Sequence, residues 1–387
     1  MKKIIFADYR HKGHRLNLLF KLIFEMPFNE LELYVNLPRV TYGSDEWSIH
    51  SPIIKDVAIN WLSVCDKVPD DDEISNWLKD SISQAKQIGA DVLIFPWADK
   101  LAEHIIKYKK SDNLPHIHML LGRCPPGIME ENDYVDQFHT IDYVKPLENK
   151  SKILNISIEK LCATFDPITN IKFASKNVRW VNDPVDNPSH LSKKDARNRL
   201  GLEKNSKYAL HIGHLSDRKK TSDIIKSWPN IYKKTGVKLI VAGEIDQTMK
   251  NRGALKKKLL MSLDDGIFCK LGVLENCDFA DFIKASDIVL CIYNAGTYMS
   301  SGVAGLAAVN GIPILSDGNS YINRLVISEG LGLVGDINDL KVFEIINELI
   351  ILKTKRFPYN KSNYSNFYNQ FFLDCLPKKS CNKYHKS

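Results

Sequence analysis

The chain has 387 residues, more than a single hydrophobic core usually organises, so two domains are expected. Hydrophobic residues make up 44% and charged residues 26%, and no window reaches the roughly 20 apolar residues that cross a membrane. The N-terminus, MKKIIFADYR, lacks the apolar length of a signal peptide. Eight scattered cysteines without CxxC spacing argue against a disulfide scaffold or a zinc site and favour reduced thiols in the cytoplasm.

The net charge of +7 is unevenly distributed. The first 183 residues hold 23 Lys and Arg against 26 Asp and Glu, a net of −3, which leaves +10 for the remainder. Because aromatic residues do not interleave with the basic ones, as in proteins that bind single-stranded nucleic acid, we expect no nucleic-acid partner. A diphosphate ligand or anionic lipid headgroups account for the basic half more simply.

The first half alternates short apolar strands with helical patterns, which predicts a parallel α/β sheet. A strand over residues 3–8, a turn that contains Gly13 and a helix over residues 15–26 resemble the opening of a Rossmann-like domain, although a lone glycine also fits a simple turn. Arg123 follows an apolar strand over residues 116–121 and is a candidate contact for an acceptor. Residues 182–191, with two prolines and no periodicity, predict a linker.

The most informative stretch is CIYNAGTYMSSGVAGLAAVNGIPILSD at residues 291–317. It predicts a buried strand, a polar loop, a helix of small residues from Gly302 to a left-handed Gly311, and a second strand. Ser300, Ser301 and Gly302 then lie at the helix N-terminus, where free N–H groups favour an anion, and Gly302 and Gly305 let it approach. We interpret the stretch as a phosphate cradle for a nucleotide; an ordinary serine cap explains the same residues equally well.

Several motifs in the second half follow a recognisable order: ARNRLGL at 196–202, LHIGHLSDRKK at 210–220, KLIVAGE at 238–244, CKLGVLENCDFADFIKASDIVL at 269–290 and AAVNGIPILSDG at 307–318. From about Pro184 to Leu352 this order resembles the donor-binding domain of glycosyltransferase family 4. The resemblance implies the α/β GT-B fold, in which two Rossmann-like domains with parallel sheets face each other across a cleft. The expected parts are an acceptor-side domain (1–183), a nucleotide-sugar-binding domain (184–357), a helix that crosses back (358–376) and a basic tail (377–387).

The resemblance also implies the residues that hold the donor. Lys219 matches the family's diphosphate-binding lysine, His214 stands where an arginine is usual, and Arg218 is a candidate to supply that charge. Lys219 and Arg218 are therefore the candidate catalytic cations, because a departing nucleoside diphosphate gains negative charge in the transition state. A solvated basic loop is the alternative interpretation. The candidate donor-binding residues are Gly13, Gly213, His214, Gly243, Tyr298, Ser300, Ser301 and Gly302.

The sequence lacks two acidic residues that the family uses in its donor site. Two glutamates bracket the central loop in the family, and Tyr298 and Leu306 stand at those positions here. Asn294 and Asp317 are the nearest polar side chains. The resemblance still favours a glycosyltransferase, retaining and independent of metal, that moves a sugar from a UDP- or GDP-linked donor to a saccharide or lipid-linked acceptor in surface polysaccharide or glycolipid synthesis. No other cofactor is expected.

Two other functions also fit the sequence. The first is a GT-B-like subunit that binds a nucleotide or a partner without turnover, which the loss of both glutamates favours. The second, weaker alternative is another GT-B enzyme, such as a nucleotide-sugar epimerase. The expected location is the cytoplasm, with a peripheral contact at the inner membrane face left open.

Overall fold

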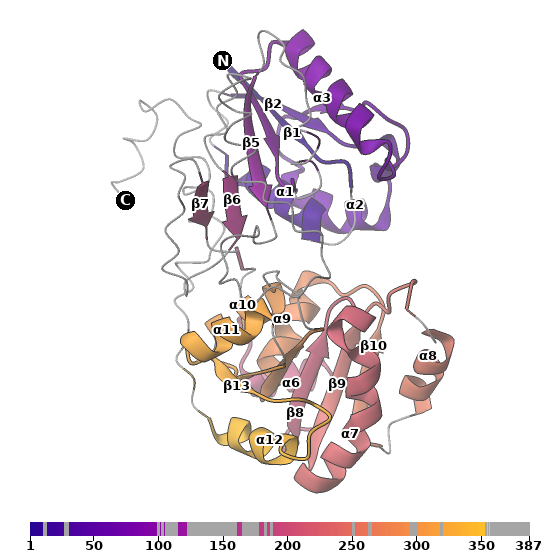
Figure 1. Ribbon diagram of the computed structural model, residues 1–387, viewed down its shortest axis with the longest axis vertical. Helices are drawn as coiled ribbons and strands as arrows, with labels where there is room; N and C mark the ends of the chain where they lie inside the picture. Colours follow the sequence, from indigo (N-terminus) through magenta and orange to yellow (C-terminus); the bar gives the residue numbers. More distant parts are fainter. Residues whose placement is uncertain are drawn as a thin grey trace.

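The computed structural model describes residues 1–10, 14–26, 31–98, 101, 104, 115–121, 161–164, 178–181, 184–185, 189–249, 252–261, 265–294, 301–317, 320–352, 354 and 356. In this part of the chain, two parallel sheets occupy separate halves of the molecule (Figure 1). Both sheets were expected from the alternation of strands and helices. None of the helices described is long and apolar enough to cross a bilayer.

The first sheet has the strand order β3-β2-β1-β4-β5-β6-β7, and all its neighbouring strands run parallel. Its strands are β1 (Lys2–Ala7), β2 (Leu31–Asn36), β3 (Asn60–Leu62), β4 (Val92–Phe95), β5 (His116–Leu121), β6 (Leu161–Thr164) and β7 (Val178–Val181). The helices described here are α1 (His14–Phe24), α2 (Asp45–His50) and α3 (Ile74–Ile88), with 3-10 turns η2 (Arg39–Thr41) and η3 (Ser51–Ile54). In chain order β6 and β7 are its last two strands, and they lie at one edge of the sheet.

The second sheet has the order β10-β9-β8-β11-β12-β13, again parallel throughout. Its strands are β8 (Lys207–Ile212), β9 (Val237–Gly243), β10 (Ile267–Leu271), β11 (Ile288–Ile292), β12 (Ile314–Asp317) and β13 (Gly332–Val334). Its helices are α6 (Lys193–Arg199), α7 (Thr221–Thr235), α8 (Arg252–Met261), α9 (Asn276–Ala285), α10 (Gly302–Asn310), α11 (Tyr321–Ser328) and α12 (Val342–Ile351), with the 3-10 turn η5 (Asp217–Lys219).

Both strand orders contain the reversal that is typical of Rossmann-like sheets. The chain builds outward from β1 to β3 and then crosses to β4, and it repeats this pattern from β8 to β10 and then β11. In open parallel sheets, ligands bind beyond the carboxyl ends of the strands at such a reversal. The topology of the second sheet therefore predicts a ligand site at the loops that follow β8 and β11.

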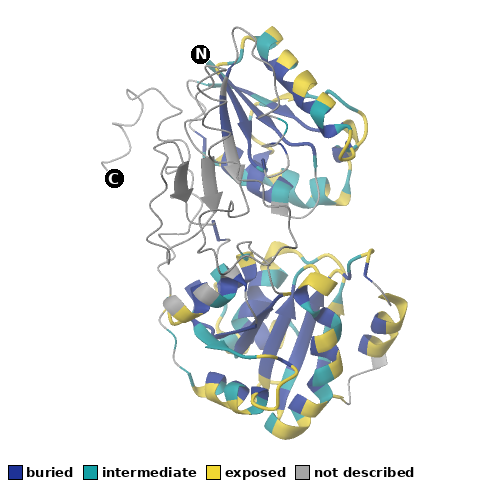
Figure 2. Ribbon diagram, in the orientation of Figure 1, coloured by how far each residue is buried: buried dark blue, intermediate teal, exposed yellow. Residues whose placement is uncertain are grey.

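The inner strands of the second sheet, β8, β9, β11 and β12, are buried, and the surrounding helices present exposed outer faces (Figure 2). One hydrophobic cluster joins α6, α9, α10 and α11 to the sheet, and a second joins α7, α8 and α12 to it. Val185, just before α6, packs into the first of these clusters. The linker over residues 182–191 and the domain boundaries stay predictions, and the predicted C-terminal helix lies outside the described residues.

Candidate functional site

The loops that follow β8 and β11 are joined at the strand reversal of the second sheet. The backbone N–H of Asn294 donates to the carbonyl oxygen of Arg218 at 2.9 Å, and the Asn294 side-chain amide donates to that of Asp217 at 3.2 Å. The Arg218 guanidinium lies 5.2 Å from the centre of the Tyr293 ring. Arg218 itself is exposed, so its charge remains available to a ligand in solution.

Lys219 is buried at this reversal. Its residue surface is 8% exposed, and its ammonium donates to the carbonyl oxygen of Ile212, the last residue of β8, at 2.9 Å. Among the described residues, no carboxylate lies within 4.0 Å of this ammonium. Burial and the neighbouring Arg218 charge lower the pKa of Lys219 to about 8. An ammonium can donate three hydrogen bonds, so Lys219 is a partly desolvated cation with capacity for an anion.

Gly213 and Gly243 provide room for Lys219. Gly213 has a φ of 99°, and a Cβ on it would lie 3.1 Å from the Lys219 ammonium nitrogen. Gly243 has a φ of 130°, and a Cβ there would collide with the backbone of Gly213. Both positions therefore exclude larger residues for steric reasons. The structure gives these predicted donor-binding glycines a packing role beside the lysine.

Ser301 is the N-cap of α10, as predicted. Its hydroxyl accepts from the backbone N–H of Ala304 at 3.3 Å and shares a hydrogen bond of 2.8 Å with the buried hydroxyl of Tyr293. Gly302 opens the helix, and a Cβ there would have no neighbour within 4 Å. The hydrogen bond between Tyr293 and Ser301 thus joins the helix N-terminus to the end of β11.

The expected role of Gly305 is wrong. A Cβ at Gly305 would lie 2.8 Å from a methyl group of Val185, so this glycine accommodates the buried Val185 side chain and does not expose backbone to an anion. The helix end was predicted correctly, because Gly311 has a left-handed φ of 68°.

His214 is turned toward a carboxylate. Its Nε2 lies 2.8 Å from an oxygen of Asp246, and more than half of its side chain is exposed. The N–H and hydroxyl of Thr248 also donate to Asp246, and these bonds together with His214 lower the pKa of that carboxyl. His214 therefore lies at the rim of the loop that holds Lys219, next to an acid.

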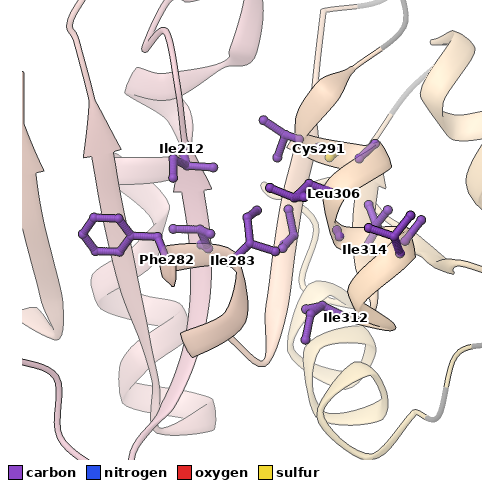
Figure 3. Packing of buried hydrophobic residues seen from close by; sticks show 14 of the residues in the cluster. Ile212, Phe282, Ile283, Cys291, Leu306, Ile312 and Ile314 are labelled. Carbon is purple, nitrogen blue, oxygen red and sulfur yellow. The ribbon is translucent and has the colours of Figure 1, made fainter. Parts of the chain in front are cut away.

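Leu306 has no access to a ligand. It is 2% exposed and lies among Ile283, Cys291 and Ile314 in the hydrophobic cluster (Figure 3). Asp317 pairs with Lys220 at 2.6 Å, and the Asn294 side chain donates to the backbone of Asp217, so both polar side chains have partners within the protein. Gly13, Arg123, Tyr298 and Ser300 lie outside the described residues, and their roles stay predictions.

Sequence reasoning missed several buried polar groups around Lys219. His211 is fully buried, and its Nε2 lies 2.9 Å from the Thr221 hydroxyl; burial and the Lys219 charge lower its pKa to about 3. The hydroxyl of Ser216 is buried without a hydrogen-bond partner in the described part of the chain. Burial raises the pKa of the Cys291 thiol to about 12. His211 and Cys291 lie in apolar strand sequences, so no local pattern distinguishes them from core residues.

Solved structures share this architecture over almost their whole length. Sucrose-phosphate synthase from Thermosynechococcus elongatus matches with a TM-score of 0.62 and 12% identity over 98% of this chain and 96% of that one. HepE from Anabaena, in complex with UDP and glucose, matches with a TM-score of 0.58 and 13% identity over 99% of each chain. WaaG, a glycosyltransferase involved in lipopolysaccharide biosynthesis, matches with a TM-score of 0.55 and 12% identity over 99% and 100%.

The fold is GT-B. The predicted fold class is therefore confirmed, including its two Rossmann-like parallel sheets. No family model matches the sequence, and no curated protein matches it either. Membership of glycosyltransferase family 4 consequently stays a prediction, and at these identities the likeness to solved structures concerns the backbone alone.

Proposed function

We propose that this protein is a glycosyltransferase that takes a sugar from a nucleoside diphosphate and transfers it to a saccharide or lipid-linked acceptor. The observation that carries the proposal is the Lys219 ammonium. It is buried at the strand reversal of a GT-B sheet and bonded to one carbonyl, and no described carboxylate lies within 4.0 Å of it. Burying a charge without an opposite charge costs stability, and a phosphate ligand would offset that cost.

The nucleotide proposed first is UDP. HepE from Anabaena was crystallised with UDP, with UDP and glucose, and with UDP-glucose, which supports a UDP-linked donor for a chain of the same fold. Lys219 and Arg218 would neutralise the diphosphate as the bond to the sugar breaks, and the α10 N-terminus would add its dipole. The proposal includes retention at the anomeric carbon, as the resemblance to glycosyltransferase family 4 implies. It also includes independence of a divalent cation, since Lys219 and Arg218 can supply the positive charge that the leaving diphosphate requires.

The proposal also covers the acceptor, for which it names a domain and a class of molecule but no residues. We assign the acceptor to the first domain and the reaction to surface polysaccharide or glycolipid synthesis in the cytoplasm, next to the membrane where a lipid-linked acceptor would reside. WaaG, which shares the fold, is involved in lipopolysaccharide biosynthesis. A subunit that binds a nucleotide without turnover is the second candidate. Leu306 supports it, because this buried apolar residue stands at one of the two positions where the family has a glutamate.

The direct test is nucleotide release. Purified protein is incubated with UDP-glucose, UDP-galactose, UDP-N-acetylglucosamine or GDP-mannose, with and without extracted glycolipid or oligosaccharide, and free UDP or GDP is measured. Release that depends on the acceptor supports the glycosyltransferase. Binding of a nucleotide without release from any donor, alone or with acceptor, would favour the second candidate.

The affinity for UDP is expected to depend on pH through Lys219. Its pKa of about 8 in the free protein means that the ammonium loses its proton above pH 8, and phosphate favours the protonated form. The second pKa of a phosphate is about 6, so the phosphates of UDP no longer titrate in this range. We expect the Kd for UDP to rise about tenfold per pH unit above pH 8. Calorimetric titrations from pH 7.5 to 9.5 check this, and an unchanged Kd would contradict it.

A further inference from the structure

Lys220 has a backbone conformation that its residue type disfavours. It is the one non-glycine residue with a positive φ among the described residues, at φ 47° and ψ 34°. It lies between η5 and α7, and its backbone N–H donates to the backbone carbonyl oxygen of Asp217 at 3.0 Å. Left-handed backbone is costly for side chains with a Cβ and persists only where surrounding contacts hold it.

The contact that holds Lys220 comes from another strand. Its ammonium lies 2.6 Å from a carboxylate oxygen of Asp317, the last residue of β12, and the Asp317 side chain is 7% exposed. In the sheet, β11 lies between β8 and β12. The ion pair therefore joins the loop after β8 to the end of β12, across the strand that leads to Tyr293 and Asn294.

Three consecutive bases are directed to three different places by this turn. Arg218 lies over the Tyr293 ring, Lys219 turns back to the carbonyl of Ile212, and Lys220 pairs with Asp317. A flexible basic loop would not keep Lys219 buried against its own strand, because the ammonium would regain water. The left-handed turn at Lys220 reverses the chain directly after Lys219.

We propose that the Lys220–Asp317 ion pair is a positioning device, which holds the turn that places Lys219 for the phosphate and leaves Lys220 itself unavailable as a phosphate ligand. This inference rests on the proposed function for its ligand. It also has a consequence in the free protein, because release of the pair would let Lys219 reach solvent.

The first test measures nucleotide affinity by titration with UDP. Asp317→Asn is expected to raise the Kd about tenfold or more. Lys220→Gly accepts the left-handed turn but cannot form the ion pair, so it should raise the Kd by a smaller factor of at least about three. Lys220→Arg should keep a Kd near that of the wild type. Asp223→Asn, which alters an exposed carboxylate on α7, is the matched control and should change nothing. In the double variant with Lys219→Ala, Asp317→Asn should have almost no further effect.

Several results would overturn the proposal. Tighter UDP binding in Asp317→Asn would mean that Lys220 binds phosphate once it is released. An unchanged Kd in both Asp317→Asn and Lys220→Gly would mean that the turn needs no ion pair. Additive losses with Lys219→Ala would mean that the pair acts on the fold in general.

A second measurement needs no nucleotide and separates this proposal from the proposed function. The rate at which acetic anhydride labels Lys219 is followed against pH by mass spectrometry. The wild-type pKa near 8 should move toward the ordinary 10.5 in Asp317→Asn as the ammonium becomes exposed. Loss of a nearby negative charge would by itself lower the pKa, so a fall or no change contradicts the proposal. If wild-type protein binds no UDP but this shift is observed, the proposed function fails and the positioning role stands.

Discussion

Lys219→Met is expected to raise the Kd for UDP about a hundredfold, to a value that titration still measures. In the same protein it is expected to raise the free energy of unfolding by about 1–2 kcal/mol at pH 7. The substitution removes a buried ammonium that has one carbonyl partner and replaces it with an apolar chain of similar length. The ligand-free protein loses a desolvation cost, whereas the complex loses a charge-assisted hydrogen bond to phosphate. Opposite changes in stability and affinity are the signature of a residue kept for binding.

Urea denaturation and calorimetry with UDP measure the two quantities. Lys226→Met provides the control, because Lys226 is exposed on α7 of the same domain and should alter neither stability nor affinity. The wild-type protein should also become more stable between pH 8 and pH 10, since Lys219 binds fewer protons in the folded than in the unfolded state there. A Lys219→Met protein that is destabilised and binds UDP with the wild-type Kd would show that this lysine is structural.

Asp287→Ala is expected to destabilise the second domain by about 3–5 kcal/mol. The carboxylate of Asp287 is 9% exposed and lies 2.7 Å from the guanidinium of Arg197, which is itself 6% exposed. It also pairs with Lys193 at 2.9 Å and accepts from the backbone N–H of Tyr208 at 2.8 Å. Removal of the acid leaves the buried guanidinium with two backbone carbonyl acceptors but no opposite charge, and it leaves the backbone donor at the start of β8 without its acceptor.

Urea denaturation monitored by tryptophan fluorescence measures this loss, since Trp228 is buried in the same domain. Asp66→Ala is the matched control. Its ion pair with Arg39 at 3.4 Å joins side chains that are 82% and 75% exposed, and such pairs contribute little, so a change within about 0.5 kcal/mol is expected. Equal effects of the two substitutions would contradict the account of the Asp287 cluster.

The fold could be predicted from the sequence because its signals are local. Short apolar runs such as Lys207–Ile212 and Ile288–Ile292 became buried strands, and Gly311 ended its helix in the left-handed conformation. Motif order across the second half pointed to the architecture that the structure shows.

The site could be predicted only in part because its contacts join distant segments. Lys219 was selected as a candidate from the sequence, but no local pattern reveals that it is buried beside Gly213, which follows β8, or that Gly213 packs on Gly243 at the end of β9. Lys220 and Asp317 are 97 residues apart, and lysine is not a residue type that predicts a positive φ. Gly305 was misassigned because its partner, Val185, lies outside its own motif.

The central claim is that the strand reversal of the second sheet binds a nucleoside diphosphate. Thermal unfolding of the wild-type protein and of Lys219→Ala with UDP, GDP, ADP and CMP tests it most directly. At about 100 times its Kd, a ligand adds about 2.7 kcal/mol of stability. We predict a clear rise in the unfolding temperature with one diphosphate, UDP first among them, and none in the variant. No rise with any nucleotide, or equal rises in both proteins, would contradict the account.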